Sequence, residues 1–567
     1  MHLGTLRGIP RLPPILFAVL LLNLAQVLAQ DVGIERLPAE ARPLLPDYPP
    51  PRQPSDFVLP PVEEVPQVGV TGEVRFVLRD VQFIGNTVFD DATLRQLART
   101  YLGRSVSMAD LEGLRMRLTR YYNQAGYVTS GAILPDQHIR NGRVVYRIVE
   151  GSLTHVQVQG TQRLRPEYVS DRLSLGLTQP LNARQLQERF QLLLTDPLIE
   201  RLNGELIPGA APGESILDLR VTRSRPYALY LGYDNHRPPS IGSEEVIMGG
   251  HLHNLTDYGD MLSFETALSE GATDYEVGFF VPLSPADTRF NLRYVRGESS
   301  VVEESLQIAD IRSDFQTLEL GVTQPLWRTL QESFSLGLTL ALRKSQTFML
   351  GRGTPFSLGV EDDGKSSTSV IRFTQDYVSR SRRQVLAARS TFSLGMDAFD
   401  ATINEGLPDG RFFSWIGQIQ YARRLGTQGA QVMLRGDLQW TNDRLLPLER
   451  FAIGGATSVR GYRENEFVRD NGFDASVEFR YPLFGGRLAA SGHSLQLAAF
   501  YDLGSAWNKG ERGDAPVISS LGGGLLWDCR VLSAAVYFAH ALDEVSEKTE
   551  YDLQDDGIHF SLVVKVF

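Results

Sequence analysis

Alternation of apolar and polar residues runs through the C-terminal part of the chain. From Tyr227 onward, segments of about ten residues alternate with a period of two and are separated by Gly, Asp, Asn and Ser. One face of the last segment, "GIHFSLVVKVF", is entirely apolar and consists of Ile558, Phe560, Leu562, Val564 and Val566. Its other face carries His559, Ser561 and Lys565. We count roughly sixteen such segments and predict antiparallel strands.

Strands with one apolar and one polar face fit two classes of protein. In a soluble all-β domain the polar face meets water, whereas in a transmembrane barrel it lines a wet lumen and the apolar face meets lipid. The segment "GFDASVEFRYPLF" places three charged residues on one face, and we expect them to line a lumen: Asp474, Glu478 and Arg480. The even strand number favours the barrel, and the final Phe567 resembles the end signature of bacterial outer-membrane barrels.

Residues 74–225 follow a different pattern, in which short strands alternate with helical periodicity. The same order, β-α-α-β-β, occurs twice. In the first copy, Asp90 or Asp91 is the expected N-cap of one helix, and Gly126 is expected to end the next. Asn141-Gly142 is a strong signal for a turn between the two following strands. We therefore predict two small α+β domains.

The N-terminus carries the features of an export signal. Arg7 and Arg11 precede the apolar run "ILFAVLLLNLAQVLA", which ends at Ala29, a suitable cleavage point. A membrane anchor is the alternative, but Asn23 and Gln26 interrupt the run, which is too short to span a bilayer. The following stretch is rich in proline, so it is a linker or tail in which Pro38 leaves little room for the short helix that "DVGIERLPAEAR" suggests. The predicted organisation is a signal peptide at 1–29, a Pro-rich tail at 30–70, α+β domains at 71–151 and 152–225, and a barrel at 226–567.

Composition narrows the function classes. A chain of 567 residues is long enough for several domains, and a formal charge of −11 without a dense basic block argues against nucleic acid as a partner. The single cysteine, Cys529, permits no internal disulfide, which fits a bacterial envelope protein. After the N-terminal segment no window approaches 18 consecutive apolar residues, so transmembrane helices are not expected.

Few residues suggest chemistry. His251 and His253 share one strand face, as metal ligands do, but nearby carboxylates are scarce and a lumen or interface pair is the better interpretation. "GGGLL" at 522–526 lacks the lysine and the strand-turn-helix setting of a phosphate loop, and glycines near bends fit barrel corners. No Ser/His/Asp or Cys/His set is visible. We predict no enzyme activity, no cofactor and no metal.

A long connection, "GGATSVRGYRENEF", stands out because it places Arg460 among glycines and small residues. Long connections in such barrels lie on the outside of the membrane. Alternation in "HSLQLAAFYDLGSAW" points Asp502 into the lumen, so a loop folded inward would set the planar donor fork of Arg460 against that carboxylate. Gly454, Gly455 and Gly461 would let the backbone pass close to the wall.

These motifs resemble those of a known superfamily. Val459, Arg460, Gly461 and Tyr462 form "VRGY", and Phe500, Asp502 and Gly504 form "F-x-D-x-G". Together they look like the paired signature of the outer-membrane insertase and secretion superfamily. "FIGNT" and "QAGY" in the first α+β copy resemble motifs of the POTRA domain, the polypeptide-transport-associated domain. Two such domains before a barrel of about sixteen strands resemble the two-partner secretion transporters of the haemolysin and filamentous haemagglutinin type.

The resemblance implies a function and a place in the cell. The POTRA-like pair would capture an unfolded exoprotein in the periplasm of a Gram-negative bacterium through its N-terminal secretion segment, and the barrel, a monomer in outer-membrane lipid, would secrete it. Some family members carry a tail helix that plugs the barrel, and the proline density of residues 31–70 argues against one here. An assembly factor that inserts other barrels is the alternative, but such relatives usually have more POTRA copies. A passive porin would leave residues 70–225 without a task.

Overall fold

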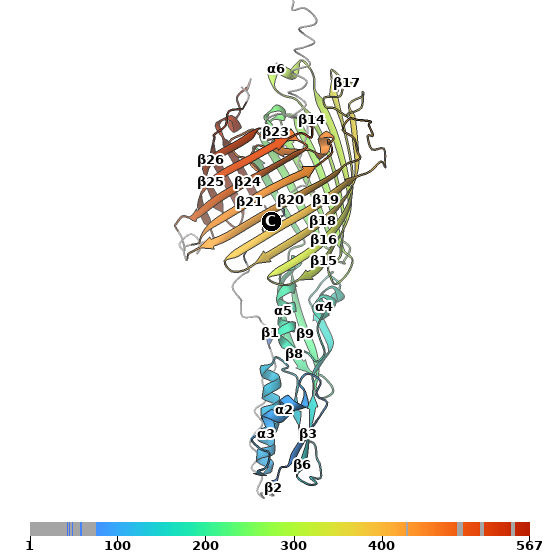
Figure 1. The fold of residues 1–567 in the computed structure, drawn as a ribbon, viewed down its shortest axis with the longest axis vertical. Coiled ribbons are helices and arrows are strands. Elements are labelled where there is room, and N and C mark those ends of the chain that lie inside the picture. The colour runs from blue at the N-terminus through green and yellow to red at the C-terminus, as the bar shows by residue number, and fades with distance from the viewer. Residues whose placement is uncertain are drawn as a thin grey trace, which may run out of the picture. The chain divides into compact units, whose positions relative to one another are not determined.

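The computed structural model describes residues 42–43, 45, 48, 57–58, 75–426, 429–484, 492–510, 515–545 and 550–566. The predicted signal peptide, the suggested tail helix except Arg42, and Phe567 lie outside these residues. The chain forms two compact units. One contains Pro50–Pro226 with Asn254–Gly259, and the other contains the strands that begin at Tyr227 (Figure 1).

The strands from Tyr227 onward form a closed antiparallel barrel, as predicted. Sixteen long strands and the two-residue β17 make up its wall. In chain order they are β10 (Tyr227–Asp234), β11 (Glu245–His253), β12 (Met261–Ser269), β13 (Ala272–Pro282), β14 (Arg289–Ser300), β15 (Arg312–Arg328), β16 (Glu332–Met349), β17 (Arg352–Gly353), β18 (Lys365–Arg380), β19 (Gln384–Gly395), β20 (Phe413–Leu425), β21 (Ala430–Thr441), β24 (Asn471–Pro482), β25 (Ser494–Trp507), β26 (Val517–Asp528), β27 (Leu532–Ala541) and β28 (Ile558–Lys565).

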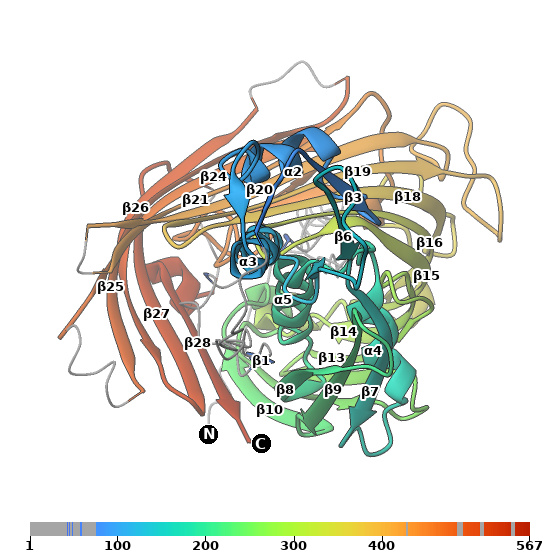
Figure 2. The same ribbon diagram turned by 90° about the horizontal axis from the view of Figure 1, so that it is seen from below.

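The first and last strands close the ring. Tyr230–Asp234 of β10 pair with Ser561–Lys565 of β28, and Figure 2 shows these strands next to each other. Closure leaves no unpaired edge along the wall, which a strand protein in lipid requires. Short helices lie in the connections: η1 (Pro239–Ile241), α6 (Glu304–Gln307), η2 (Pro447–Glu449) and η3 (Leu553–Asp556).

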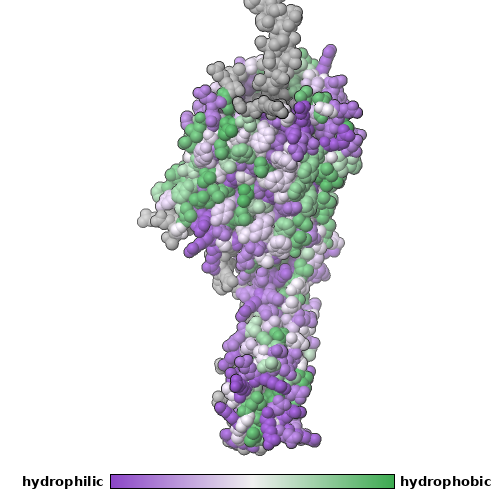
Figure 3. All heavy atoms as spheres, in the orientation of Figure 1, coloured by the Kyte–Doolittle hydropathy of each residue, from purple (hydrophilic) through white to green (hydrophobic). Residues whose placement is uncertain are grey.

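The two faces of each barrel strand differ as the alternation predicts. Tyr501 and Leu497 are exposed on the outside of β25, whereas Asp502 is fully buried on the inside. In β28, Leu562 is 37% exposed, and His559 on the opposite face is buried. Figure 3 shows hydrophobic residues gathered on the outer surface of the barrel. Apolar side chains therefore face outward, as in a membrane barrel rather than a soluble sandwich.

The first α+β copy packs two helices on a small sheet. The sheet has the order β3-β6-β5, with a short β2–β4 pair beside it. Its elements are β2 (Phe76–Val77), β3 (Asp80–Ile84), α2 (Asp91–Ala98), β4 (Ser105–Val106), α3 (Met108–Gln124), β5 (Gly131–Ile133) and β6 (Arg143–Val149). Asp90 is the N-cap of α2 and accepts a hydrogen bond from the Thr93 amide. β5 is short and ends two residues before Pro135, which has no amide to donate.

A single carboxylate joins three parts of this copy. Glu150 follows β6 and accepts hydrogen bonds from the amides of Thr87 and Val88 at 2.8 and 2.9 Å and from the Tyr122 hydroxyl at 2.9 Å. Thr87 belongs to the "FIGNT" motif and Tyr122 to α3. Partial burial acts to raise the pKa of Glu150, but the hydrogen bonds outweigh it and hold that pKa below its usual value.

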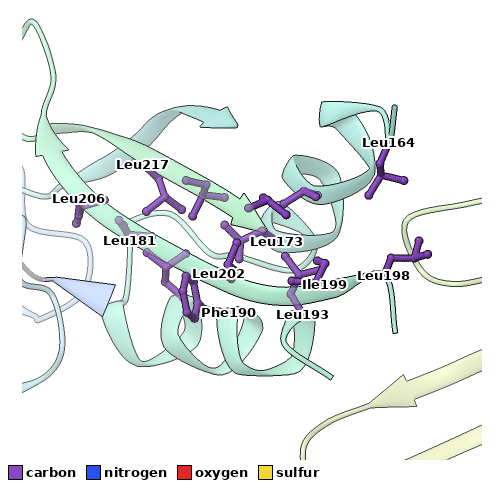
Figure 4. Close-up of a cluster of buried hydrophobic side chains, with 14 residues drawn as sticks. Leu164, Leu173, Leu181, Phe190, Leu193, Leu198, Ile199, Leu202, Leu206 and Leu217 are labelled. Atoms are coloured by element: carbon purple, nitrogen blue, oxygen red, sulfur yellow. The ribbon is translucent and has the colours of Figure 1, made fainter. Parts of the chain in front are cut away.

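The second α+β copy has the same order with longer strands. It consists of β7 (Ser152–Gln159), α4 (Pro166–Ser174), α5 (Ala183–Leu193), β8 (Ile199–Pro208) and β9 (Glu214–Arg223). The helices and the sheet enclose one apolar core, which includes Leu173, Phe190 and Leu217 (Figure 4). The tail adds a two-residue strand, β1 (Phe57–Val58), which pairs in parallel with β8 and extends the sheet to the order β1-β8-β9-β7.

The predicted fold class is confirmed by this architecture. One local interpretation is wrong: Gly522–Gly524 do not form a barrel corner but lie in the middle of β26. Among the described residues, no helix combines the length and the apolar composition needed to cross a bilayer.

Candidate functional site

The connection from β21 to β24 folds back into the barrel. It contains η2 and a small antiparallel hairpin of β22 (Phe451–Ile453) and β23 (Phe467–Arg469). Its side chains form an apolar cluster with the wall that includes Ile453, Val459 and Tyr462 from the loop and Ala506 and Ile518 from β25 and β26. We call residues 442–470 the inner loop. A loop whose apolar side chains are buried against the wall is an ordered element rather than a loose surface connection.

The Arg460 side chain lies against the wall at Asp502 on β25. Its Nε and one terminal nitrogen donate to the two carboxylate oxygens at 2.7 and 2.9 Å, and the Arg460 backbone amide donates to Oδ2 at 3.1 Å. Both side chains are shielded, with 3% and 0% of their surface exposed. The planar guanidinium thus makes the two-pronged contact for which lysine has no equivalent.

A second carboxylate and two aromatic rings complete the surroundings of Arg460. Its other terminal nitrogen donates to Glu478 on β24 at 2.6 Å, and Ser476 accepts a further hydrogen bond at 3.2 Å. The guanidinium carbon lies 3.4 Å from the centre of the Phe500 ring and 4.7 Å from that of Tyr537. Glu478 also accepts from Arg480 at 2.5 Å, so this carboxylate has two cationic partners.

Missing side chains at two wall glycines make room for the motif residues. A Cβ added at Gly504 would lie 2.8 Å from a methyl carbon of Val459, and one added at Gly522 would lie 2.6 Å from the Phe500 ring. Gly504 therefore lets the inner loop approach β25, and Gly522, in the glycine run of β26, leaves space for the ring beneath Arg460. Gly461 has φ of +91°, a backbone conformation that favours glycine.

The residues after Arg460 attach to strands near the end of the chain. The Gly461 amide donates to His559 Nε2 on β28 at 3.1 Å, and the Tyr462 hydroxyl donates to the Ser519 carbonyl on β26 at 2.8 Å. Arg463 contacts both oxygens of Asp555 at 2.7 and 2.8 Å. Burial acts to lower the pKa of Arg463, but the hydrogen bonds and charge of Asp555 outweigh it and raise that pKa.

The beginning of the inner loop is held by an ion cluster of the opposite sign. Glu449 accepts hydrogen bonds from Arg343 on β16 at 3.0 Å, from Arg372 on β18 at 2.8 Å and from the Thr368 hydroxyl at 3.1 Å. The three ionic side chains are 0 to 3% exposed. Sequence reasoning missed this cluster. Alternation along β16 and β18 places both arginines on the polar face, but the sequence pattern does not indicate that Glu449 is their partner.

Tail residues also lie against the lumen wall. Arg42 forms ion pairs with Asp437 at 2.6 Å and Asp474 at 2.5 Å, two carboxylates that face each other across β21 and β24. Arg42 also donates to the carbonyl of Thr457 in the inner loop. The Asp474 charge predicted for the lumen is therefore buried beneath a tail cation.

The two histidines lie apart from this loop. His251 and His253 face the lumen side of β11, with ring centres 4.7 Å apart. Within the described residues, no group of His, Cys, Asp and Glu is arranged to hold a metal ion.

A closed barrel of sixteen strands with an inward-folded Arg460 loop and an N-terminal α+β region defines an outer-membrane barrel with POTRA domains. The family described as haemolysin secretion/activation protein ShlB/FhaC/HecB matches residues 213–526, and the ShlB-type POTRA domain matches residues 76–151. The chain belongs to this family of two-partner secretion transporters. It is a protein of the outer membrane with its POTRA region in the periplasm, and it passes a secreted exoprotein through its barrel.

Individual relatives agree with this assignment. The outer membrane transporter CdiB of Dickeya dadantii is 23% identical over 69% of each chain. The heme/hemopexin transporter protein HuxB of Haemophilus influenzae is 27% identical over 76% of each. Among solved structures, CdiB from Escherichia coli has a TM-score of 0.64 at 19% identity and covers 89% of this chain and 93% of its own. BamA from Haemophilus ducreyi lacking POTRA domains 1–3 has a TM-score of 0.54 at 11% identity over 86% of this chain and 100% of its own, which shows a shared fold.

Proposed function

We propose that the POTRA region captures the N-terminal secretion segment of the exoprotein by adding it as a strand to a sheet edge. The observation that supports this is the pairing of β1 with β8, in which Phe57 lies opposite Gly204 and Val58 opposite Glu205. An extended segment of this chain thus already adds to that edge. Backbone pairing suits a client that arrives unfolded, because main-chain hydrogen bonds form with little dependence on the side chains of the client.

The proposed domain division supplies the material for a test. The apolar cores of the two α+β copies are made from residues 76–148 and 128–221, so each is complete within 70–225. A fragment of residues 70–225 lacks β1 and should bind a peptide with the sequence of the secretion segment at micromolar concentration, with modest affinity because the peptide loses conformational freedom. The same peptide with prolines at alternate positions lacks backbone donors and is the matched control. Equal binding of both peptides, or none at high micromolar concentration, would refute capture by strand addition.

The inner loop is the proposed transport element of the barrel. Docking of Arg460 on Asp502 and Glu478 fixes the loop inside the lumen, where it lies in the route of a polypeptide. We infer that this docked position is needed for export and not for insertion of the barrel. The roles of Val459, Gly461 and Tyr462 are then to seat the loop against β25, β26 and β28.

Lipid contact and the monomeric state belong to the same proposal. The outward side chain of Leu562 is 37% exposed, and Ser561 precedes it on the inner face. Leu562→Arg should cost about 2–4 kcal/mol at the bilayer midplane and impair insertion, and Ser561→Arg should be tolerated. Equal losses of inserted protein, measured by heat-modified mobility in gels, would overturn lipid contact at this face. A mass measured in detergent above that of one chain would overturn the monomer.

A further inference from the structure

The inner loop is attached to the barrel wall at two places. We call the segment around Glu449 the base of the loop and the segment around Arg460 its tip. Glu449 contacts β16 and β18, whereas Arg460 contacts β24 and β25. In the strand order, β19, β20 and β21 lie between these two attachment points. The loop therefore spans part of the wall from one cluster to the other, and its position depends on both.

The Glu449 end is built from wall charges that need the loop. Arg343 and Arg372 point inward from neighbouring strands, and Arg372 also donates to Ser393 at 2.8 Å. Two buried cations on adjacent strands repel each other, and removing them from water is costly unless an anion is shared between them. Glu449 is the anion that both contact, and it comes from the inner loop rather than from the wall.

The backbone around Glu449 is held as firmly as its carboxylate. Arg343 donates to the Leu448 carbonyl at 2.5 Å, and the Gln439 side chain donates to the carbonyls of Glu449 and Asp470 at 3.0 and 2.9 Å. Gln439 thus connects the beginning and the end of the inner loop across its base. These contacts fix the position of the backbone just before β22. Because Arg460 follows β22 in the loop, they also constrain the position of Arg460.

We propose that Glu449 is a positioning residue for transport, which anchors the base of the inner loop so that Arg460 meets Asp502. This rests on the proposed function of the loop in export. The two clusters then act as one unit: release of the base also loosens the tip. Secretion should be impaired by loss of Glu449 although that residue lies on a different part of the wall from the "VRGY" motif.

Thiol labelling can follow the base without relying on transport. The chain has one cysteine, so Cys529→Ser provides a background without thiols. In that background Ala452→Cys places a thiol at a loop position that is 4% exposed, and Val459→Cys places one at the tip, where exposure is 0%. In the full-length chain in outer membranes, both should react slowly with a membrane-impermeant maleimide.

Glu449→Ala should raise the labelling rate at both reporters by at least about tenfold, because a locally opened segment reacts in proportion to its open population. Secretion of the exoprotein should fall by a similar factor. Glu449→Gln keeps the shape of the side chain and should insert into the membrane more readily than Glu449→Ala. It should show a smaller rise in the labelling rate at both reporters. Asp400→Ala is the matched control, since Asp400 is an exposed acid paired with Lys344, the neighbour of Arg343. It should change neither readout.

Unchanged labelling in Glu449→Gln and Glu449→Ala would overturn the anchor. Raised labelling with normal secretion would overturn the role in transport. If Ala452→Cys reacts while Val459→Cys stays protected, the two ends are independent and the coupling is wrong. The proposed export role of the loop is tested separately with Arg460→Ala. If this variant secretes normally although its tip thiol reacts rapidly, the docked loop is not needed for export.

Discussion

The ion clusters at the tip and at the base of the inner loop have the same arrangement with opposite charges. At the tip, the cation Arg460 lies between two acids, Asp502 and Glu478. At the base, the anion Glu449 lies between two cations, Arg343 and Arg372. In each case the loop supplies the single central charge and the wall supplies the pair. The wall at the tip also carries Arg480, which contacts Glu478, whereas the wall at the base presents two cations to the single anion of the loop.

The clusters differ in what remains when the central charge is removed. Without Arg460, Glu478 still contacts Arg480, and Ser476 remains beside the site. Without Glu449, Arg343 and Arg372 lose a carboxylate that both contact, and their two positive charges then face each other on adjacent strands. Two like charges buried close together without a shared counter-ion are costly, so the base should contribute more to stability and the tip more to function.

Glu449→Ala should have the largest effect on stability. Breaking a buried ion cluster by removing one partner costs on the order of 3–5 kcal/mol, and Arg460→Ala should cost less because Glu478 keeps a cation. The measurement is the denaturant midpoint of the refolded barrel, followed by heat-modified mobility. A larger loss for Arg460→Ala than for Glu449→Ala would reverse the comparison.

Arg460→Ala should leave an inserted, heat-resistant barrel that secretes poorly, because it frees the loop and spares the strand ladder. Asp502→Ala should behave alike, and the double variant should be little worse than either, since effects within one contact are not additive. Arg460→Lys should restore secretion only in part, because an ammonium lacks the planar fork. Secreted exoprotein is measured against surface-exposed barrel in each variant. Strictly additive losses would mean that the arginine acts without this aspartate.

A change of shape at the tip tests the contact without altering charge. Gly504→Ala places a methyl group 2.8 Å from the Val459 side chain and should cost about 1–3 kcal/mol of loop docking, as overpacking does. Val459→Ala in the same chain removes the opposing methyl carbons and should restore part of the loss. The readout is secreted exoprotein measured against surface-exposed barrel in each variant. If the pair of substitutions is worse than Gly504→Ala alone, the clash is not between these side chains.

The smallest effect concerns a carboxylate that is held by neutral donors instead of guanidinium. The pKa of Glu150 is lower in the folded domain than the usual value near about 4.3. Its contribution to stability is therefore complete above the unfolded pKa and is lost as the pH falls through the folded one. Unfolding of residues 70–225 should depend on pH below about 4.3, and Glu150→Gln should weaken that dependence. An unchanged acid profile in Glu150→Gln would assign the dependence to other groups.

Much of the architecture could be read from local pattern. Period-two alternation predicted the barrel strands because lipid and lumen select opposite residues at successive positions of β28 and β25. Capping chemistry at Asp90 located α2. β5 ends at Ile133, two residues before Pro135, which cannot donate to a strand ladder. The glycines of β26 were wrongly interpreted as a corner. Gly522 leaves space for the Phe500 ring on the neighbouring strand, and the sequence does not distinguish such a glycine from one that a bend requires.

The sequence by itself determined the antiparallel barrel strands, the inward face of the strands that carry Asp474, Asp502 and His559, and the arginine motif, because these depend on neighbours within a few residues. Only the tertiary structure decided that Glu449 meets Arg343 and Arg372, that His559 accepts the Gly461 amide, and that Arg42 covers Asp437 and Asp474. These partners are separated by 77 to 432 positions along the chain. Closing the barrel brings them together, and a charge on a polar face carries no information about which distant charge will neutralise it.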